Sequence, residues 1–323
     1  MPSPINIKNI TIIAHVDHGK TTLVDALLKQ SNTFSGRDDP GELIMDSNPL
    51  EREKGITILA KNASITYHGI KINIIDTPGH ADFSGEVERV MNMADGCILL
   101  VDSVDGTMPQ TRYVLQQALK YGLIPIVVIN KMDRSERREM EVLAEIDDLF
   151  LDLVTDDNQL DYPVLYASAK DGYAVLDPND EPEGIFPLLE KILEKVPSPT
   201  GSASDPLQIL VTNLDYSDYE GQICVGKISR GTVNPKKRVT LISRNESRSD
   251  HTLENVYVYE GMGRIKAKEA FVGEIVALTG LSGVSIGDTL CDQDHPESLP
   301  PIDVEEPTVK MTFGVNTSPL MGT

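Results

Sequence analysis

The chain has few cysteines, no long apolar run and few basic residues, and each shortage excludes a class of protein. Three cysteines among 323 residues are too few, and too widely spaced, for a disulfide framework, which indicates a reducing compartment. The longest apolar run, Leu123–Ile129, is far shorter than the roughly 18 residues that a membrane-spanning helix needs. The N-terminus shows no basic segment followed by an apolar one, so we expect no secretory signal. These absences predict a cytoplasmic protein that does not bind a membrane.

Positive charge is scarce. The 29 Lys and Arg residues stand against 50 Asp and Glu residues, and the formal net charge is −21. A surface of this sign repels phosphates at long range, so we do not expect this chain to hold nucleic acid through its bulk charge. Its length and its 40% hydrophobic content are nevertheless sufficient for two domains, each with a core.

The most informative stretch is residues 14–21, Ala-His-Val-Asp-His-Gly-Lys-Thr, between an apolar run at 10–13 and a helical pattern at 22–28. A strand, a tight turn and a helix in this order are typical of a phosphate-binding loop. Backbone N–H groups of the turn and of the helix N-terminus would face phosphate oxygens. Lys20 would reach the β- and γ-phosphates, and the Thr21 hydroxyl would ligate Mg²⁺. The loop residues that we expect to contact a nucleotide are His15, Val16, Asp17, His18, Gly19, Lys20, Thr21 and Thr22.

Two features of this loop leave room for another interpretation. The usual pattern begins with Gly where this chain has Ala14, and the turn survives that change if φ is negative at Ala14. His15, Asp17 and His18 could instead chelate a metal ion. A structural zinc site would need further Cys or His ligands, and the cysteines are distant in the sequence, so phosphate binding is the favoured interpretation.

Strand-like and helical patterns alternate over residues 1–197, which we predict to be the nucleotide-binding domain. The strands are continuous apolar runs, which indicates an α/β fold with a mostly parallel sheet and helices on both faces. A polar segment from Ser31 to Gly55 is too long for an ordinary connection, and we expect it to be functional or mobile. Strands are predicted at 58–67, 72–75, 97–101, 124–129 and 164–167, and helices after residue 80 and at 110–120, 136–153 and 185–195.

The second half of the chain has a different character. Residues 198–206 are rich in Pro and Ser and form a predicted linker. Short strand-like runs separated by Gly, Asn, Asp and Ser then predict a small antiparallel β-barrel domain over residues 207–303. Residues 304–323 contain a strand-like run without a partner, which predicts the truncated start of a third domain. The predicted barrel strands are 207–214, 222–229, 238–242, 253–259 and 274–278.

Two further motifs follow the phosphate loop at the ends of apolar strands, where open α/β sheets bind ligands. In residues 76–79, Asp76 could hold Mg²⁺ through a water, and the Gly79 N–H could meet the γ-phosphate. In residues 130–133, the Asp133 carboxylate would accept from N1–H and the 2-amino group of guanine, a match that adenine lacks. Asn130 would tie this loop to the phosphate loop, and the stem of Lys131 would cover the base.

A last motif, Ser168-Ala169-Lys170, would complete the base site, with the Ala169 N–H donating to guanine O6. Each motif alone is often only a turn at a strand end. Four motifs in the correct order, each after an apolar strand, predict a guanine-nucleotide-binding domain. A site whose polar groups adenine would leave unpaired can reject that base by roughly 10⁴-fold.

Further blocks of sequence resemble the translational GTPase superfamily. They are residues 52–58, Arg-Glu-Lys-Gly-Ile-Thr-Ile, the histidines of the phosphate loop, and His80 directly after the motif at 76–79. Within that superfamily, the chain resembles the BipA/TypA family over its whole length. The blocks that carry this closer resemblance are 46–48, 58–62, 85–90, 108–112, 214–216 and 306–319. The resemblance implies a GTPase that acts with the ribosome, in ribosome assembly and in stress-adaptive translation.

The resemblance also implies roles for single residues. Thr57 would ligate Mg²⁺ when a γ-phosphate is present, and His80 would position the water that attacks it. Val16 and Ile56 would form an apolar gate beside this histidine. Asp17 would help to bind a monovalent cation near the phosphates. GTP or GDP and Mg²⁺ are therefore the expected cofactors.

The partners that the resemblance implies are rRNA and ribosomal proteins, reached mainly through C-terminal domains that this chain lacks. We expect the chain by itself to be monomeric. No arginine finger is evident, so hydrolysis without the ribosome should be slow. Two alternatives stay open: a GTP-gated scaffold on the ribosome whose hydrolysis is incidental, and a tRNA-delivering elongation factor, which the family-specific blocks disfavour.

Overall fold

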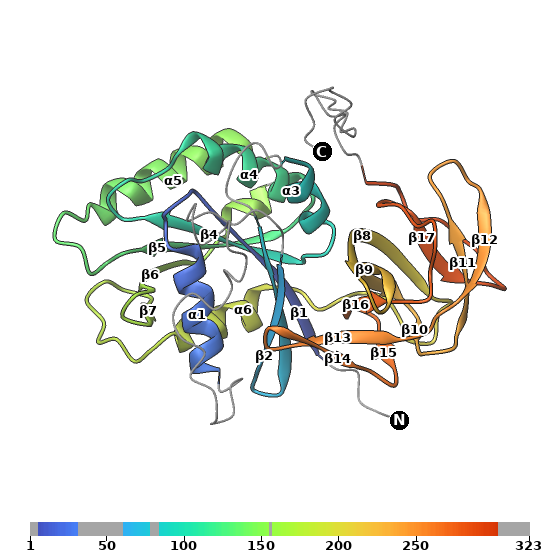
Figure 1. The fold of residues 1–323 in the computed structure, drawn as a ribbon. Coiled ribbons are helices and arrows are strands. Elements are labelled where there is room, and N and C mark those ends of the chain that lie inside the picture. Colours follow the sequence, from blue (N-terminus) through green and yellow to red (C-terminus); the bar gives the residue numbers. More distant parts are fainter. Residues whose placement is uncertain (1–5, 32–60, 78–83, 155–156, 303–323) are drawn as a thin grey trace, which may run out of the picture.

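A seven-stranded sheet organises the first half of the protein (Figure 1). The structure, a computed structural model, describes residues 6–31, 61–77, 84–154 and 157–302. The strand order is β2-β3-β1-β4-β5-β6-β7, and only the two edge strands, β2 and β7, are antiparallel to their neighbours. The elements are β1 (Ile7–Ala14), α1 (Lys20–Gln30), β2 (Lys61–Tyr67), β3 (Ile70–Asp76), α3 (Ser84–Met91), β4 (Gly96–Asp102), α4 (Pro109–Lys120), β5 (Ile124–Asn130), α5 (Glu139–Leu153), a 3-10 helix (Asp157–Leu160), β6 (Val164–Ser168), β7 (Tyr173–Val175) and α6 (Phe186–Lys195).

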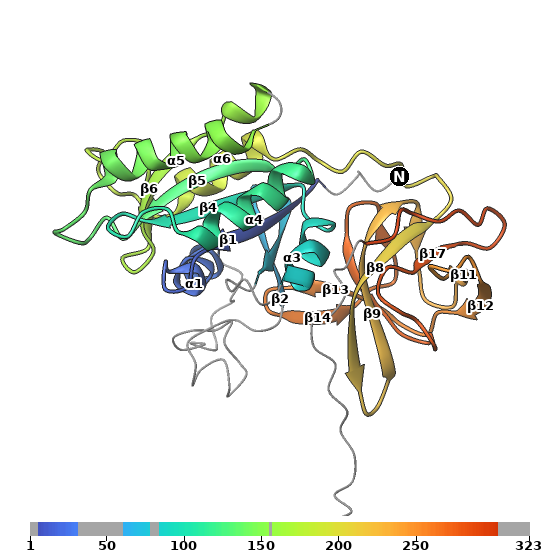
Figure 2. The ribbon, with the colours of Figure 1, turned by 90° about the horizontal axis from the view of Figure 1, so that it is seen from above.

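Helices cover both faces of this sheet (Figure 1), and Figure 2 looks down on the face that carries α4 and α5. Helices α3, α4 and α5 share a core with one face, and α1 and α6 share a second core with the other. Strand β4 is continuously apolar because both of its faces are buried. Cys97, Leu99 and Val101 belong to the first core, and Ile98 and Leu100 belong to the second. A strand that is buried on both faces cannot alternate polar and apolar residues. The predicted α/β fold with a mostly parallel sheet is confirmed.

The second half of the chain is antiparallel and encloses a third core. Its main sheet has the order β12-β11-β17-β8-β9-β16-β13-β14, and β10 pairs with β15. This architecture confirms the predicted β-barrel class. The strands are β8 (Gln208–Ser217), β9 (Gly221–Arg230), β10 (Thr232–Val233), β11 (Arg238–Ile242), β12 (Arg248–Thr252), β13 (Val256–Glu260), β14 (Gly263–Lys266), β15 (Ala270–Phe271), β16 (Ile275–Leu278) and β17 (Thr289–Asp292).

Strands β12 and β14 lie outside the runs that the sequence predicts. Every residue of β14 is exposed, and so are four of the five residues of β12. These strands therefore lack the apolar pattern that reveals a strand in a sequence. They are held by backbone pairing with β11 and β13. The helix predicted at 136–153 also begins later than expected, at Glu139.

The three cysteines are free and buried. Burial raises the pKa of Cys97 and Cys224 to about 12. These thiols are therefore protonated at neutral pH and chemically unreactive. Among the helices of the described residues, none is both long and apolar enough to cross a membrane.

An apolar contact joins the two halves of the protein. Ile223 and Val225 of β9 and Ile275 of β16 belong to the same core as Val87 and Met91 of α3. Burial of such side chains from both halves in one cluster stabilises their contact, because apolar surface is removed from water on each side. The first core of the sheet therefore continues into the barrel.

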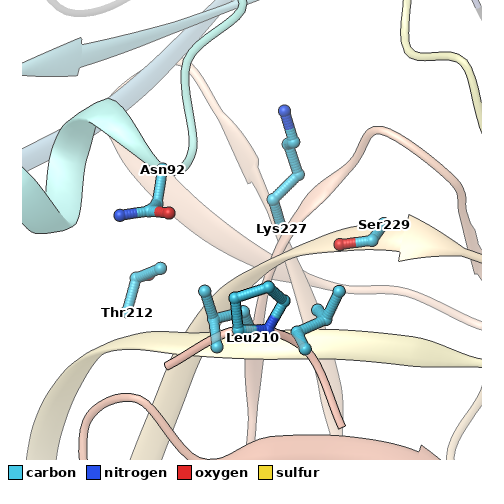
Figure 3. Close-up of a pocket in the computed structure, with 7 residues that line it drawn as sticks. Asn92, Leu210, Thr212, Lys227 and Ser229 are labelled. Atoms are coloured by element: carbon cyan, nitrogen blue, oxygen red, sulfur yellow. The ribbon is translucent and has the colours of Figure 1, made fainter. Parts of the chain in front are cut away.

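Polar side chains surround this contact. Lys227 of β9 pairs with Asp95 at 2.8 Å, and Lys71 of β3 pairs with Glu274 at 2.8 Å. A cavity of about 180 Å³ lies beside the first pair, with Asn92 facing the barrel strands across it (Figure 3). Lys227 is the charged residue of its lining, and Asp95 already neutralises that charge. We therefore interpret this cavity as a gap in the packing between the two halves and not as a ligand site.

Backbone groups join the two halves at the edge of the sheet. Ser64 of β2 donates its N–H to the Gly261 carbonyl oxygen at 2.9 Å and accepts from the Gly261 N–H at 3.1 Å. The Ser64 hydroxyl also donates to the Tyr259 carbonyl oxygen at 2.8 Å. The barrel thus adds a short piece of antiparallel backbone to the outer side of β2.

Candidate functional site

The phosphate loop predicted at residues 14–21 leaves the sheet at the carboxyl end of β1. Ala14 is the last residue of that strand, and its φ is negative, as the turn requires of an alanine. Asp17 and Gly19 make the turn instead, with φ values of 64° and 96°. Helix α1 begins at Lys20, and among the described residues no side chain caps its N-terminus. Its first N–H groups therefore remain open to an anion.

Asn130, the last residue of β5, joins the phosphate loop to the loop that follows β6. Its Nδ2 donates to the His18 carbonyl oxygen at 2.8 Å, and its Oδ1 accepts from the Ala169 N–H at 2.9 Å. Gly19 lies against this amide, because a Cβ added at Gly19 would come within 2.5 Å of Asn130 Nδ2. The Ala169 N–H, which the sequence assigns to guanine O6, is engaged by Asn130 here. A bound base would therefore share or take over that donor.

A cavity of about 280 Å³ lies between these loops. Asp133 is exposed in its lining, and its Oδ1 accepts from the buried Ser168 hydroxyl at 3.0 Å. Arg134 also lines the cavity and was not expected from the sequence, although it directly follows Asp133. The lining residues are Gly19, Thr22, Asn130, Lys131, Asp133, Arg134, Ala169 and Lys170. The structure therefore brings three of the four predicted motifs together around one hollow.

Lys20 and Asp76 meet where the phosphates and Mg²⁺ are predicted to lie. Lys20 Nζ is 2.9 Å from Asp76 Oδ1, and it donates to the Thr77 carbonyl oxygen. The Asp76 side chain is 1% exposed; its Oδ1 is neutralised by the Lys20 ammonium, and its Oδ2 has no hydrogen-bond partner among the described residues. A buried carboxylate with one unsatisfied oxygen, at a strand end and close to the start of α1, fits hydrated Mg²⁺. Thr21 directly follows Lys20 in α1.

Asp102, at the end of β4, is a site residue that the sequence did not reveal. Its buried carboxylate is 2.6 Å from Lys131 Nζ and 3.6 Å from an Arg134 nitrogen. Burial acts to raise the pKa of Asp102, but hydrogen bonds from Lys131 and from the Val104 N–H, with the charge of Arg134, hold it below its usual value. Asp102 is therefore ionised at neutral pH and fixes the direction of the Lys131 side chain.

The two histidines of the phosphate loop lie beside each other, and neither lines the cavity. Their ring centroids are 5.2 Å apart in an edge-to-face arrangement. The His18 ring is fully buried, which lowers its pKa, so this imidazole is neutral at pH 7. In the part of the chain that the structure describes, no three metal-ligating side chains come together. The metal site considered for His15, Asp17 and His18 therefore gains no support.

Of the remaining predicted site residues, two lie within the part of the chain that the structure describes and four lie outside it. Val16 is half-buried and Asp17 is exposed within the phosphate loop. The others, Ile56, Thr57, Gly79 and His80, lie outside the described residues, as does nearly all of the polar segment from Ser31 to Gly55. Their roles rest on the sequence.

Comparison with known proteins places these motifs in a family context. Residues 5–198 match the model of the elongation factor Tu GTP binding domain, and residues 206–293 match that of elongation factor G domain 2. Curated relatives include the large ribosomal subunit assembly factor BipA of Bacillus subtilis, of Synechocystis and of Escherichia coli K12, which are 48%, 50% and 51% identical to the chain. Each alignment covers 98% of this chain and 52%, 53% and 52% of the relative. The chain thus spans about half the length of the curated relatives it matches.

Solved structures show the same fold at lower identity. A protein from Thermus thermophilus is 21% identical with a TM-score of 0.67, over 91% of this chain and 55% of that one. A bacterial selenocysteine-specific elongation factor is 24% identical with a TM-score of 0.66, over 89% of this chain and 45% of that one. At these identities the likeness concerns the fold alone.

Proposed function

Because this chain belongs to the family of the elongation factor Tu GTP-binding domain, we propose that it binds GTP and GDP together with Mg²⁺ and hydrolyses GTP. The resemblance to the BipA family is confirmed by relatives about half identical to the chain over 98% of its length. The observation that carries the proposal is the cavity that Asn130 helps to form. The phosphate loop lines one part of it, and Asp133, Ala169 and Lys170 line another.

Each part of the nucleotide would meet one group of residues. Backbone N–H groups of residues 15–22 and of Gly79, together with Lys20, would hold the phosphates. Thr21, Thr57 and, through a water, Asp76 would hold Mg²⁺, which when bound neutralises charge on the phosphate oxygens. Lys20 would leave Asp76 for the phosphates, and that exchange would free the carboxylate for the metal ion. Lys20 and Asp76, which pair with each other in the structure, would therefore each contact part of the bound nucleotide–Mg²⁺ complex.

The base site makes a direct prediction for Asp133. Replacing Asp133 with asparagine should weaken GTP binding by about 10- to 100-fold, because a charge-assisted pair of hydrogen bonds to the base is lost. The same variant should gain affinity for xanthosine triphosphate, since the amide can donate to the 2-oxo group that replaces the 2-amino group. Competition between the two nucleotides measures both effects. Asp148→Asn, an exposed position on α5, is the matched control, and an unchanged preference for guanine would argue against this base site.

His80 would position the attacking water, as the family resemblance implies, with Val16 and Ile56 as the apolar gate beside it. We expect His80→Ala to leave GTP affinity close to that of the wild type, because an imidazole that orients water makes no ground-state contact with GTP. Ribosome-stimulated hydrolysis by the intact protein should fall about 10²–10⁴-fold. Single-turnover assays with and without ribosomes provide the measurement. His68→Ala, on the exposed turn between β2 and β3, is the control, and full stimulation of His80→Ala would contradict the assigned role.

The relatives named as large ribosomal subunit assembly factors support a role on the ribosome. We propose that the protein acts in the cytoplasm in assembly of the large ribosomal subunit and in stress-adaptive translation. It would contact rRNA and ribosomal proteins mainly through domains beyond this chain, which agrees with the net charge of −21. A monovalent cation beside Asp17 remains part of the proposal, because this carboxylate is exposed in the phosphate loop.

A GTP-gated scaffold on the ribosome is the alternative, and hydrolysis would then be incidental. The two functions predict different single-turnover rates. A ribosome-dependent GTPase should hydrolyse bound GTP much faster when ribosomes are added, whereas a scaffold should stay bound and hydrolyse GTP at the same slow rate.

A further inference from the structure

Strand β1 ends before its neighbour β4 does. The last residue of β1, Ala14, pairs with Leu100, whereas β4 continues to Asp102 and pairs there with Asn130 of β5. Backbone groups alternate in direction along a strand, and the Ser103 N–H donates to the Asn130 carbonyl on the β5 side. The Leu100 carbonyl and the Asp102 N–H therefore point to the side that β1 has just left.

The His18 imidazole occupies this position. Its Nδ1 lies 3.3 Å from the Asp102 N atom and 3.4 Å from the Leu100 carbonyl oxygen. An amide N–H can only donate, so we assign Nδ1 as the acceptor of the Asp102 bond and place the ring proton on Nε2, which has no hydrogen-bond partner among the described residues. In the other tautomer, Nδ1 would donate to the Leu100 carbonyl oxygen instead. The ring is fully buried, so water does not offer the Asp102 N–H another acceptor there.

His18 is also connected to the base site through its main chain. Its carbonyl oxygen accepts from Asn130 Nδ2 at 2.8 Å. The Asp102 carboxylate, whose N–H the imidazole binds, holds Lys131 Nζ at 2.6 Å. A continuous series of bonded groups thus runs from the phosphate loop, through the end of β4, to the loop that would hold the guanine base.

We propose that His18 is a positioning residue whose imidazole replaces the missing strand partner of β4 and holds the phosphate loop in register with the base loop. Its effect on nucleotide affinity depends on the function proposed above, whereas its bond to Asp102 does not. No contact between the His18 side chain and the nucleotide is required. Only an acceptor at the position of Nδ1 is needed.

Three replacements of His18 distinguish a hydrogen-bond acceptor for the Asp102 N–H from a side chain that only fills space. Asparagine carries its Oδ1 two bonds beyond Cβ, as far as Nδ1 lies in histidine, whereas the oxygen of glutamine lies at the distance of Nε2. We expect His18→Leu to raise the Kd for GDP about tenfold, because a buried N–H loses its acceptor. His18→Gln should lose as much, and His18→Asn should restore most of the affinity. His295→Leu, at an exposed position, is the matched control.

A second measurement is independent of nucleotide. Hydrogen exchange of the Asp102 amide, followed by NMR in the nucleotide-free protein, should be slow in wild type and His18→Asn and clearly faster in His18→Leu and His18→Gln. Equal behaviour of the asparagine and glutamine variants in both measurements would overturn the proposal, and so would unchanged exchange in His18→Leu. If His18→Leu does not fold, the asparagine and glutamine pair decides. If wild type binds no GDP, the proposed function fails, and the exchange rates alone decide the role of His18.

Discussion

Replacing Lys20 with alanine should abolish measurable binding of GTP at micromolar concentrations. Truncating one partner of a buried charge pair costs roughly 2–5 kcal/mol, which is about 30- to several-thousand-fold in affinity. The loss is large because Lys20 is the cation expected at the β- and γ-phosphates. A titration with fluorescent GTP measures it, and Lys29→Ala, exposed near the end of the same helix, is the matched control. Near-normal affinity in Lys20→Ala would refute the phosphate loop.

The same substitution should also destabilise the nucleotide-free protein. Asp76 is buried, and Lys20 Nζ lies 2.9 Å from its Oδ1. Removal of the ammonium leaves an uncompensated buried charge, which typically costs about 3–5 kcal/mol. Adding Asp76→Asn to Lys20→Ala should recover much of that free energy of unfolding, but it should not restore GTP binding. Denaturant unfolding of the single and the double variant tests this. If the two have the same free energy of unfolding, the ion pair does not stabilise the protein as proposed.

Replacing Gly19 with alanine should damage both the backbone turn and the link between the loops. Gly19 has a φ of 96°, which costs a non-glycine residue roughly 1–2 kcal/mol. The new Cβ would also lie 2.5 Å from Asn130 Nδ2, so Asn130 would have to move away from the His18 and Ala169 backbones. Loss of buried hydrogen bonds adds about 1–3 kcal/mol. We expect the affinity for GDP to fall about 10²-fold as Asn130 is displaced.

The control variant Gly122→Ala separates the effect of backbone strain from the effect of the clash with Asn130. Gly122, which follows α4, has a φ of 72°, and an added Cβ would meet no atom within 4 Å. This control should lose only the roughly 1–2 kcal/mol of backbone strain and should keep its affinity for GDP. Unfolding free energies and GDP titrations of both variants provide the comparison. If Gly19→Ala binds GDP as well as Gly122→Ala does, the contact with Asn130 is not needed for nucleotide binding.

The parts of the candidate site that could be predicted are short motifs at the ends of apolar runs. Asn130 and Asp133 follow a run that must be a buried strand, so the local sequence determines both where the strand ends and which polar group stands there. Asp76 is placed by the same reasoning. The chain's alternation of runs likewise predicted the parallel sheet, because a strand buried on both faces has a visible composition.

The remaining features depend on contacts between distant residues. Asp102 ends an apolar strand without any motif, and its role comes from Lys131, which lies in another loop. His18 was assigned to the nucleotide from its place in the loop, but spacing along a sequence does not show that its side chain points inward to β4. Strands β12 and β14 are exposed and are held by backbone pairing, which leaves no pattern of residue types.

The bridge between Ser64 and Gly261 has a consequence for solubility. An edge strand presents unpaired N–H and C=O groups that can recruit a strand of another molecule. At one edge of the seven-stranded sheet, Gly261 covers Ser64 of β2, and at the other edge β7 is only 3 residues long. The first edge is therefore interrupted at Ser64, and the second is short. At Ser64 the barrel blocks pairing with a strand of another molecule, and the first half separated from it would expose the Ser64 backbone to other chains.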